Sequence, residues 1–312
     1  MSSFPTSPSS VCAMSQVIWS QWPDLIVPSG FTSLNPNNCD LDSADLSEIT
    51  FYVPKYMGGK QALEYSTKMS NLKFLQVPNA GFEDAIEYMK PGMTLCNARG
   101  VHDDSTAELA VGLAIAVRRG LHDFVRAQDR GAWIHERYSS FSDSNIAIIG
   151  FGSIGQSLAK KLSGFEVSIK AFSRSGKDGA VKLDQLDAYL PQADIVFLTL
   201  PLNAESKNLF DAVRLSKMKN GSLIINVARG PIINTEALIE ELNSGRLSAG
   251  LDVTDPEPLP PDHPLWRAKN CLIAPHVGGD STAFESRGKK LVEEQIARLA
   301  NGEELINIVA RG

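Results

Sequence analysis

The chain has 312 residues, of which 43% are hydrophobic and 21% are charged, and its formal net charge is −6 at pH 7. This length and composition are typical of a globular protein with about two domains. The acidic balance argues against a protein that binds nucleic acids or anionic membranes through its general charge.

No apolar run reaches the roughly 18 residues that a membrane span needs. The four cysteines stand far apart in the sequence, which predicts neither a zinc site nor a disulfide framework and favours reduced thiols in the cytoplasm. Residues 1–14 lack the basic and apolar regions of a signal peptide, so we expect a disordered leader. Whether Met1 or Met14 is the true start stays open.

From about Gln16 to Asn97, short apolar stretches alternate with helical ones, which predicts a small α/β domain with a parallel sheet. We interpret the apolar stretches as buried strands, because β-branched and aromatic residues are frequent in them. The expected strands contain QVIWS, ITFYV, LKFLQV and MTLCN, and the expected helices contain GGKQALEYSTKM and FEDAIEYM.

A long helix is predicted after this first region. Ser105, with Glu108 three residues later, has the spacing of a capping box at a helix N-terminus. Apolar residues then recur at helical spacing as far as Phe124, and no proline interrupts them. We expect one continuous helix that leads the chain from one domain into the next.

Six apolar strands follow from Asn145 onwards, as nearly continuous runs typical of parallel strands covered on both faces. Helical segments separate most of them, among them 160–163 and Thr235–Ser244, and Gly245 ends the latter. The pattern predicts a doubly wound α/β sheet, and a last helix over about Thr282 to Ala300. The expected strands contain NIAIIG, VSIKAF, DIVFLTL, SLIINVA, AGLDV and CLIAPH.

Three glycines, Gly150, Gly152 and Gly155, follow the first of these strands in the spacing G-x-G-x-x-G. In this motif the first glycine forms a tight turn, the second lets the backbone approach a pyrophosphate, and the third lets helix and strand pack closely. The helix that begins at the loop offers free N–H groups to the phosphates. The motif predicts a dinucleotide site, with a merely structural glycine turn as the alternative.

The end of the next strand bears on the choice of cofactor. NAD sites place an acidic residue there for the ribose hydroxyls, whereas this chain has Ser173, Arg174 and Ser175 and no carboxylate at hand. A guanidinium beside hydroxyls suits a 2′-phosphate. We expect NADP(H) as the preferred cofactor and NAD(H) as the second; a solvated turn with a surface arginine is the alternative.

Three ionisable residues stand at or just after later strand ends, where ligands bind in doubly wound sheets. Arg229 closes LIINVARG, Glu257 lies in DVTDPEPLP, and His276 closes CLIAPH. Singly they suggest a surface arginine, a loop glutamate and a core histidine. Together they predict a carboxylate clamp with an acid–base pair, and His263, in PPDHPLW, is the competing candidate for the base.

These features resemble the D-isomer-specific 2-hydroxyacid dehydrogenases from about Leu72 to the C-terminus. The segments FSRS and DPEPLPPDHPLW are most similar to the NADP-preferring glyoxylate/hydroxypyruvate reductases of that family. The other matching segments are TAELAVGLAIAVRRG, GFGSIG, FLTLPLNAES, INVARGPIINTEAL and APHVGG.

The resemblance implies a Rossmann cofactor domain, residues 102–282, inserted into a smaller flavodoxin-like domain formed by 15–101 and 283–312. It implies an oxidoreductase that uses NADPH to reduce small 2-oxo acids to D-2-hydroxy acids, and a homodimer. Two rivals stay open: a same-fold dehydrogenase acting on phosphoglycerate, phosphite or formate, and a dinucleotide-sensing protein without catalysis. The sequence leaves the side chain of the substrate and the physiological direction open.

The resemblance also implies the roles of single residues. Arg229 orients the substrate, His276 acts as acid and base, and Glu257 is its partner; no metal is implied. The implied substrate-binding residues are Ala80, Gly81, Arg229 and His276. The cofactor-binding set, from the motif and the resemblance together, is Gly150, Gly152, Ser153, Ile154, Gly155, Ser173, Arg174, Ser175, Thr199, Leu200, Pro201, Val227, Ala228, Asp252, His276 and Gly278.

Overall fold

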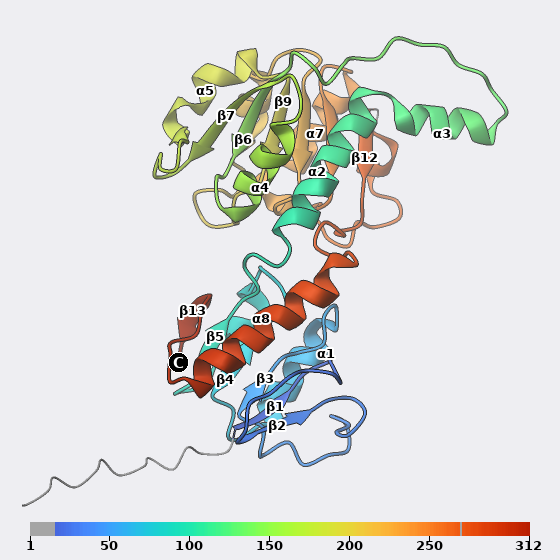
Figure 1. Cartoon of the computed structure of the whole chain (residues 1–312). Coiled ribbons are helices and arrows are strands. Elements are labelled where there is room, and N and C mark those ends of the chain that lie inside the picture. The colour runs from blue at the N-terminus through green and yellow to red at the C-terminus, as the bar shows by residue number, and fades with distance from the viewer. Residues whose placement is uncertain (1–15, 269) are drawn as a thin grey trace, which may run out of the picture. The chain divides into compact units, whose positions relative to one another are not determined.

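The computed structural model describes residues 16–268 and 270–312 (Figure 1). The expected leader, residues 1–14, lies outside them. The described residues divide into two compact units: residues 16–101 with Phe284–Gly312, and His102–Ala283. Each unit is built on its own sheet, and the mixed α/β fold with parallel sheets confirms the predicted fold class.

The sheet of the first unit has the order β13-β5-β4-β3-β1-β2. Its first five strands in the chain are parallel and adopt the flavodoxin-like order 2-1-3-4-5, whereas the last strand is antiparallel at the edge. The four expected strands are present. Two edge strands were not expected, β2 because half of its residues are polar and β13 because it lies in a short tail. The bounds are β1 Gln16–Trp19, β2 Phe31–Leu34, β3 Phe51–Tyr52, β4 Phe74–Gln76, β5 Thr94–Cys96 and β13 Ile308–Arg311.

Both faces of this sheet are apolar, so consecutive strand residues enter different cores. Ile18 and Phe51 pack with residues of α8, whereas Trp19 and Tyr52 belong to the cluster on the other face. The expected helices are present, although parts of them are 3₁₀ helix. Their bounds are α1 Gly59–Glu64, η1 Tyr65–Lys68, η2 Glu83–Tyr88 and α8 Ala283–Ala300.

The second unit holds a fully parallel sheet in the order β12-β11-β10-β9-β6-β7-β8. This is the doubly wound arrangement, with the strand order reversing between β6 and β9. All six expected strands are present, and only the two-residue β8 was missed. The bounds are β6 Asn145–Ile149, β7 Ser168–Ser173, β8 Val181–Lys182, β9 Ile195–Leu198, β10 Leu223–Asn226, β11 Ser248–Leu251 and β12 Cys271–Ile273.

Helices cover both faces of this sheet (Figure 1). Ile146 and Ile148 pack against α2 and α4, whereas Ala147 and Ile149 pack in the cluster of α5, α6 and α7. Alternate strand residues therefore fill two cores, which explains the continuous apolar runs. The bounds are α2 Asp103–Arg118, α4 Ser153–Leu162, η3 Leu183–Gln185, α5 Leu186–Tyr189, η4 Leu190–Gln192, α6 Ala212–Ser216, η5 Gly230–Ile232, α7 Thr235–Asn243 and η6 Pro264–Arg267.

The expectation of one continuous helix up to Phe124 is wrong. The chain breaks at Gly120, whose φ of 63° is left-handed, and a separate helix α3, Leu121–Asp129, follows. The ring of Tyr138 lies where a side chain at 120 would be, at 2.2 Å from an ideal Cβ. Apolar spacing continues across the glycine, so periodicity alone does not reveal the break.

The capping box at Ser105 is also wrong. Helix α2 begins at Asp103, so its N-cap residue is His102 and not Ser105. The Ser105 hydroxyl lies inside the first turn and donates to the carbonyl oxygen of His102 at 3.1 Å. Asp103 and Asp104 stand in that first turn, where their negative charge interacts favourably with the positive end of the helix dipole.

Candidate active site

The glycine loop joins strand β6 to helix α4. The Gly150 N–H donates to the carbonyl oxygen of Phe172, and Thr199 donates its hydroxyl to the Gly150 carbonyl at 2.6 Å. Gly155 faces that same carbonyl, and an ideal Cβ at 155 would stand 2.2 Å from the oxygen. Only glycine allows this close approach of helix and strand, as the motif requires.

The residues at the start of α4 fit a dinucleotide. Gly152 is the N-cap residue, and no side chain of the described residues caps the helix there. The first turn carries no acidic residue, and Gly152 and Ser153 are exposed. The N–H groups of this turn are therefore available to a pyrophosphate, which the positive end of the helix dipole also favours.

Arg174 follows strand β7 and does not stand alone. Its Nη1 lies 3.8 Å from Oε2 of Glu205, and the two side chains are 82% and 72% exposed. The expectation of no carboxylate at hand is therefore wrong. Glu205 was missed because it follows a different strand, β9, and a search along the chain after β7 does not reach it. Strand order reveals it, since β7 and β9 both neighbour β6.

Arg229 follows strand β10 and has a fixed backbone. The buried side chain of Asn226 donates to the Arg229 carbonyl at 2.9 Å and accepts from the Ala228 N–H at 3.0 Å. The guanidinium donates to the Ala228 carbonyl at 2.7 Å. Asn226 was not among the expected site residues, although its place at the end of a buried strand is a usable signal.

Asp252 follows strand β11 and holds the loop after strand β12. Its buried carboxylate, 2% exposed, accepts from the N–H groups of Val277 at 2.8 Å and Gly278 at 2.9 Å. Its carbonyl accepts from the His276 N–H at 2.7 Å. Burial raises the pKa of Asp252, and the two amide hydrogen bonds oppose that rise. An ideal Cβ at 278 would stand 2.7 Å from the carboxylate, so the site requires glycine.

His276 is paired with Glu257. The histidine has a left-handed φ of 57°, which is uncommon for a residue with a side chain. Its Nδ1 is hydrogen-bonded to Oε1 of Glu257. With Nδ1 donating to the carboxylate, Nε2 becomes the nitrogen that can exchange a proton. Both side chains are partly exposed, which suits a group that meets a substrate.

The sheet brings the expected site residues of this unit onto one edge. Arg229, Asp252 and His276 follow the adjacent strands β10, β11 and β12, and Glu257 joins them through His276. The other expected cofactor residues also follow strands at this edge. These are Thr199, Leu200 and Pro201 after β9, and Val227 and Ala228 after β10.

Two other histidines of this unit, His263 and His102, have structural partners. The Nδ1 of His263 accepts from the Leu265 N–H at 3.2 Å, which caps η6. His102 is buried, and its Nδ1 lies 3.1 Å from the carbonyl oxygen of Gly279. The residue that begins α2 thus contacts the loop after His276, a link that the sequence did not reveal.

Ala80 and Gly81 lie in the first unit, in the loop after strand β4. The buried Asn97 donates its side-chain amide to the Ala80 carbonyl at 2.7 Å, and the Ala98 N–H donates to the Asn79 carbonyl at 2.9 Å. These bonds fix the two peptides on either side of Ala80. The sequence did not single out Asn97.

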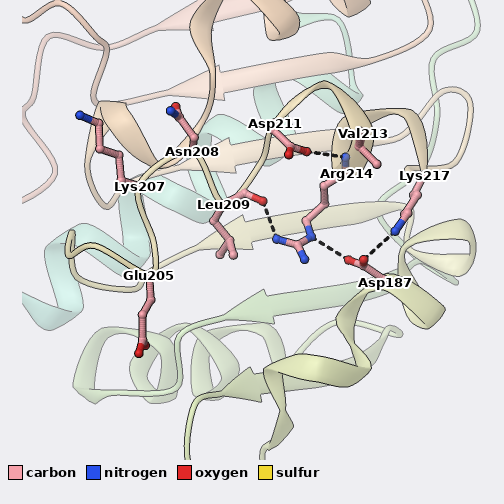
Figure 2. A pocket seen from close by; sticks show the side chains of 9 residues that line it. All are labelled: Asp187, Glu205, Lys207, Asn208, Leu209, Asp211, Val213, Arg214 and Lys217. Carbon is pink, nitrogen blue, oxygen red and sulfur yellow. Dashed lines mark hydrogen bonds and ion pairs between the residues drawn. The ribbon is translucent and has the colours of Figure 1, made fainter.

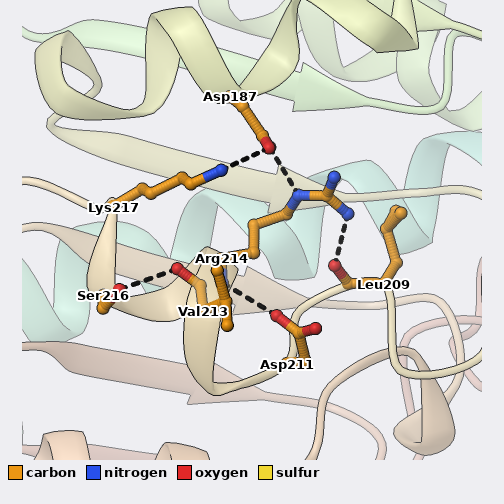
Figure 3. Close-up of polar contacts among 7 residues, drawn as sticks. All are labelled: Asp187, Leu209, Asp211, Val213, Arg214, Ser216 and Lys217. Atoms are coloured by element: carbon orange, nitrogen blue, oxygen red, sulfur yellow. Dashed lines mark hydrogen bonds and ion pairs between the residues drawn. The ribbon is translucent and has the colours of Figure 1, made fainter.

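A hollow of about 220 Å³ lies elsewhere on the second unit. None of the expected site residues lines it, and three of its charged side chains, Asp187, Arg214 and Lys217, pair with one another (Figure 2). Asp187 accepts from Arg214 at 2.7 Å and from Lys217 at 2.6 Å, and the bond from Arg214 is the main cause that lowers the pKa of Asp187 (Figure 3). The hollow joins α5 to α6 and is not the candidate site. It is lined by Asp187, Glu205, Lys207, Asn208, Leu209, Asp211, Val213, Arg214 and Lys217.

Metal-ligand groups and membrane-spanning helices were sought within residues 16–268 and 270–312. Within these ranges no group of three or more histidine, cysteine, aspartate or glutamate side chains is arranged to hold a metal ion. Within the same ranges, every helix is too short or too polar to cross a membrane.

A family model described as the NAD-binding domain of D-isomer specific 2-hydroxyacid dehydrogenases matches residues 111–278. The chain is 33% identical over 248 residues to a glyoxylate reductase from Thermofilum pendens, covering 75% of this chain and 73% of that protein. It is 33% identical over 239 residues to the glyoxylate reductase/hydroxypyruvate reductase from Mus musculus, covering 70% of each. Phosphoglycerate and formate dehydrogenases are also among the similar proteins.

The fold is similar to that of solved structures. A D-isomer specific 2-hydroxyacid dehydrogenase family protein from Aeromonas salmonicida superposes with a TM-score of 0.82 at 25% identity. The superposition covers 95% of this chain and 99% of the other. The likeness therefore extends over both units and not only over the segment that the family model matches.

Proposed function

The chain belongs to the D-isomer specific 2-hydroxyacid dehydrogenase family, which acts on 2-hydroxy acids with NAD(P), and we propose that it is an NADPH-preferring reductase of small 2-oxo acids. The products would be D-2-hydroxy acids, with glyoxylate and hydroxypyruvate as the expected substrates. The observation that carries this proposal is the His276–Glu257 pair, on the strand edge that also holds the glycine loop and Arg229.

Different residues would meet different parts of the cofactor. The N–H groups at the start of α4 would hold the pyrophosphate, and Arg174 the 2′-phosphate. Thr199, Leu200 and Pro201 would line the adenosine side, whereas Val227, Ala228, Asp252 and Gly278 would surround the nicotinamide end. When bound, the nicotinamide dinucleotide supplies the hydride to the carbonyl carbon of the substrate.

The protein's own side chains would position the substrate and move the proton. The Arg229 guanidinium would hold the carboxylate and carbonyl of the 2-oxo acid, and Ala80 and Gly81 of the first unit stay predicted substrate-binding residues. Protonated His276 would donate from Nε2 to the carbonyl oxygen as negative charge develops there. Glu257 accepts from Nδ1, which leaves Nε2 of His276 as the nitrogen for the proton transfer. In the reverse direction His276 would accept the hydroxyl proton.

The test is a substrate panel followed by the loss of NADPH absorbance. Glyoxylate, hydroxypyruvate and bulkier 2-oxo acids are each mixed with the protein and NADPH or NADH. We expect turnover of glyoxylate or hydroxypyruvate that is faster with NADPH. An absence of turnover on every 2-oxo acid would contradict the proposal.

The two rivals predict other results in the same panel. A dehydrogenase for another substrate would be active with 3-phosphoglycerate, phosphite or formate and NAD(P)⁺, but inactive on unphosphorylated 2-oxo acids. A dinucleotide sensor would bind NADPH, measured by its fluorescence, and turn over none of the compounds. The complete set of Arg229, Glu257 and His276 supports an enzyme over a sensor.

We also propose that the protein is a homodimer in the cytoplasm. Figure 1 shows α3 and the segment after it reaching away from the sheet of the second unit. This region exposes Val125 and Trp133, the latter 97% accessible, and such apolar exposure supports self-association. Light scattering after gel filtration should give twice the mass of the chain; a monomer would contradict the dimer.

A further inference from the structure

The ion pair between Arg174 and Glu205 lies beside the glycine loop. Strands β7 and β9 are the two neighbours of β6 in the sheet. Arg174 follows β7, Glu205 lies in the loop after β9, and the glycine loop follows β6. Because the carboxyl ends of parallel strands share one edge, the two charged side chains approach from both flanks of the predicted cofactor loop. They meet with 3.8 Å between Nη1 and Oε2.

The loop that carries Glu205 has an ordered backbone. The Asn203 side chain accepts from the N–H groups of Glu205 at 2.9 Å and Ser206 at 3.0 Å. The Ser206 hydroxyl is buried and donates to the Pro201 carbonyl at 2.7 Å. The backbone position of Glu205 is therefore set by hydrogen bonds that begin at Pro201.

Glu205 does not belong to the charge cluster of the nearby hollow. Asp187, Arg214 and Lys217 already pair with one another, and Figure 2 shows the Glu205 side chain directed away from them. Its partner is Arg174 alone among the ion pairs of the described residues. The carboxylate is accordingly placed for the ligand of Arg174.

We propose that Glu205 is a selectivity residue that opposes Arg174 in the choice between the two cofactors. This inference rests on the proposed function, in which Arg174 binds the 2′-phosphate. A 2′-phosphate on Arg174 must displace Glu205 from the ion pair and lie close to a like charge. A cofactor without that phosphate offers ribose hydroxyls, which a carboxylate accepts well. Glu205 thus supplies from β9 the acidic group that the end of β7 lacks, and it keeps NAD(H) as a usable second cofactor.

The test is the affinity of the Glu205→Gln variant for NADP⁺ and NAD⁺, measured by isothermal titration calorimetry without substrate. Removal of a neighbouring like charge should tighten NADP⁺ by up to about fivefold, which corresponds to the interaction of two unit charges about 4 Å apart in water. Loss of the charged acceptor should weaken NAD⁺ about threefold to tenfold. The gain for NADP⁺ should shrink in 0.5 M NaCl, because salt screens exposed charges.

Glu166→Gln is the matched control, because Glu166 is an exposed glutamate of the same unit at the opposite end of strand β7. It should leave both affinities unchanged. Both variants should keep the wild-type melting temperature, since Glu205 is 72% exposed and its side chain joins no core. If Glu205→Gln leaves the ratio of the two dissociation constants unchanged, the role of Glu205 is refuted.

Failure of the proposed function gives a different result. Arg174→Gln should weaken NADP⁺ and spare NAD⁺ if Arg174 holds the 2′-phosphate. Unchanged NADP⁺ affinity in Arg174→Gln would remove that assignment and, with it, the basis of the inference. A shift in Arg174→Gln together with no shift in Glu205→Gln refutes the inference alone.

Discussion

The strand-end edge of the second unit has two halves that differ in construction. At β10, β11 and β12 the buried carboxylate of Asp252 holds the backbone of the next loop, and the position of His276 follows from these bonds. At β6, β7 and β9 the exposed side chains of Arg174 and Glu205 pair across the glycine loop. Buried hydrogen bonds fix a geometry, whereas exposed ion pairs contribute little stability, about 0.2–1 kcal/mol. Substitutions that disturb the Asp252 bonds should change turnover and stability together, and those of Arg174 and Glu205 should change cofactor choice alone.

The largest effect is expected at His276. His276→Asn removes the proton donor but keeps a polar side chain of similar size, so kcat should fall by about 10²–10⁴-fold. The variant should still bind NADPH, measured by its fluorescence, because the glycine loop is untouched. Turnover close to that of wild type would remove His276 from the acid–base role.

Gly278→Ala tests the buried half directly. The added Cβ would stand 2.7 Å from the Asp252 carboxylate, so the loop must shift and lose its amide bonds. Overpacking of this kind costs about 1–3 kcal/mol, which should appear as a lower urea midpoint together with a lower kcat. A variant that loses turnover while keeping the wild-type midpoint would break the link between stability and geometry in this half.

Arg174→Asp tests the exposed half. A charge-assisted hydrogen bond to phosphate is lost, and the KM for NADPH should rise about 10- to 100-fold. The KM for NADH should change far less, and the urea midpoint should stay at its wild-type value because Arg174 is 82% exposed. Equal effects on both cofactors would refute the phosphate assignment.

The smallest effect is a pH dependence at Asp252. Burial raises the pKa of this carboxyl above 3.8 in the folded chain. The stability from its protonated form is therefore fully present below the unfolded pKa and is lost as the pH rises through the folded pKa. Asp252→Asn cannot ionise and should not lose this contribution. The free energy of unfolding of the variant, relative to wild type, should increase with pH across this interval; a constant difference would contradict the assignment.

The strands of both sheets were largely predictable, because parallel strands between two apolar layers need uninterrupted apolar residues. Edge strands such as β2 carry no such signal, since only part of each strand is covered. The boundary between α2 and α3 was mispredicted because Gly120 interrupts the helix and leaves the apolar spacing intact.

The candidate site was predictable where a strand end and a reactive residue coincide in the sequence, as at Arg229 and His276. It was not predictable where two strands distant in the chain approach each other. Glu205 lies 31 positions beyond Arg174 (205 − 174), and only the order of β7, β6 and β9 shows that they meet. Asn226 and Asp252 act through backbone groups, whose partners cannot be read from residue types.

Gly250, in strand β11, has a consequence that extends beyond packing. An ideal Cβ there would come within 2.6 Å of the Ile225 side chain and 3.1 Å of that of Leu113 in α2. A larger residue would have to displace the side chain of Ile225 or that of Leu113 in α2, and α2 has His102 as its N-cap residue. His102 contacts Gly279 in the loop after His276. We therefore expect Gly250 substitutions among the inactive variants of a genetic screen. Their loss of activity would resemble that of substitutions in the loop after His276, although Gly250 lies in strand β11.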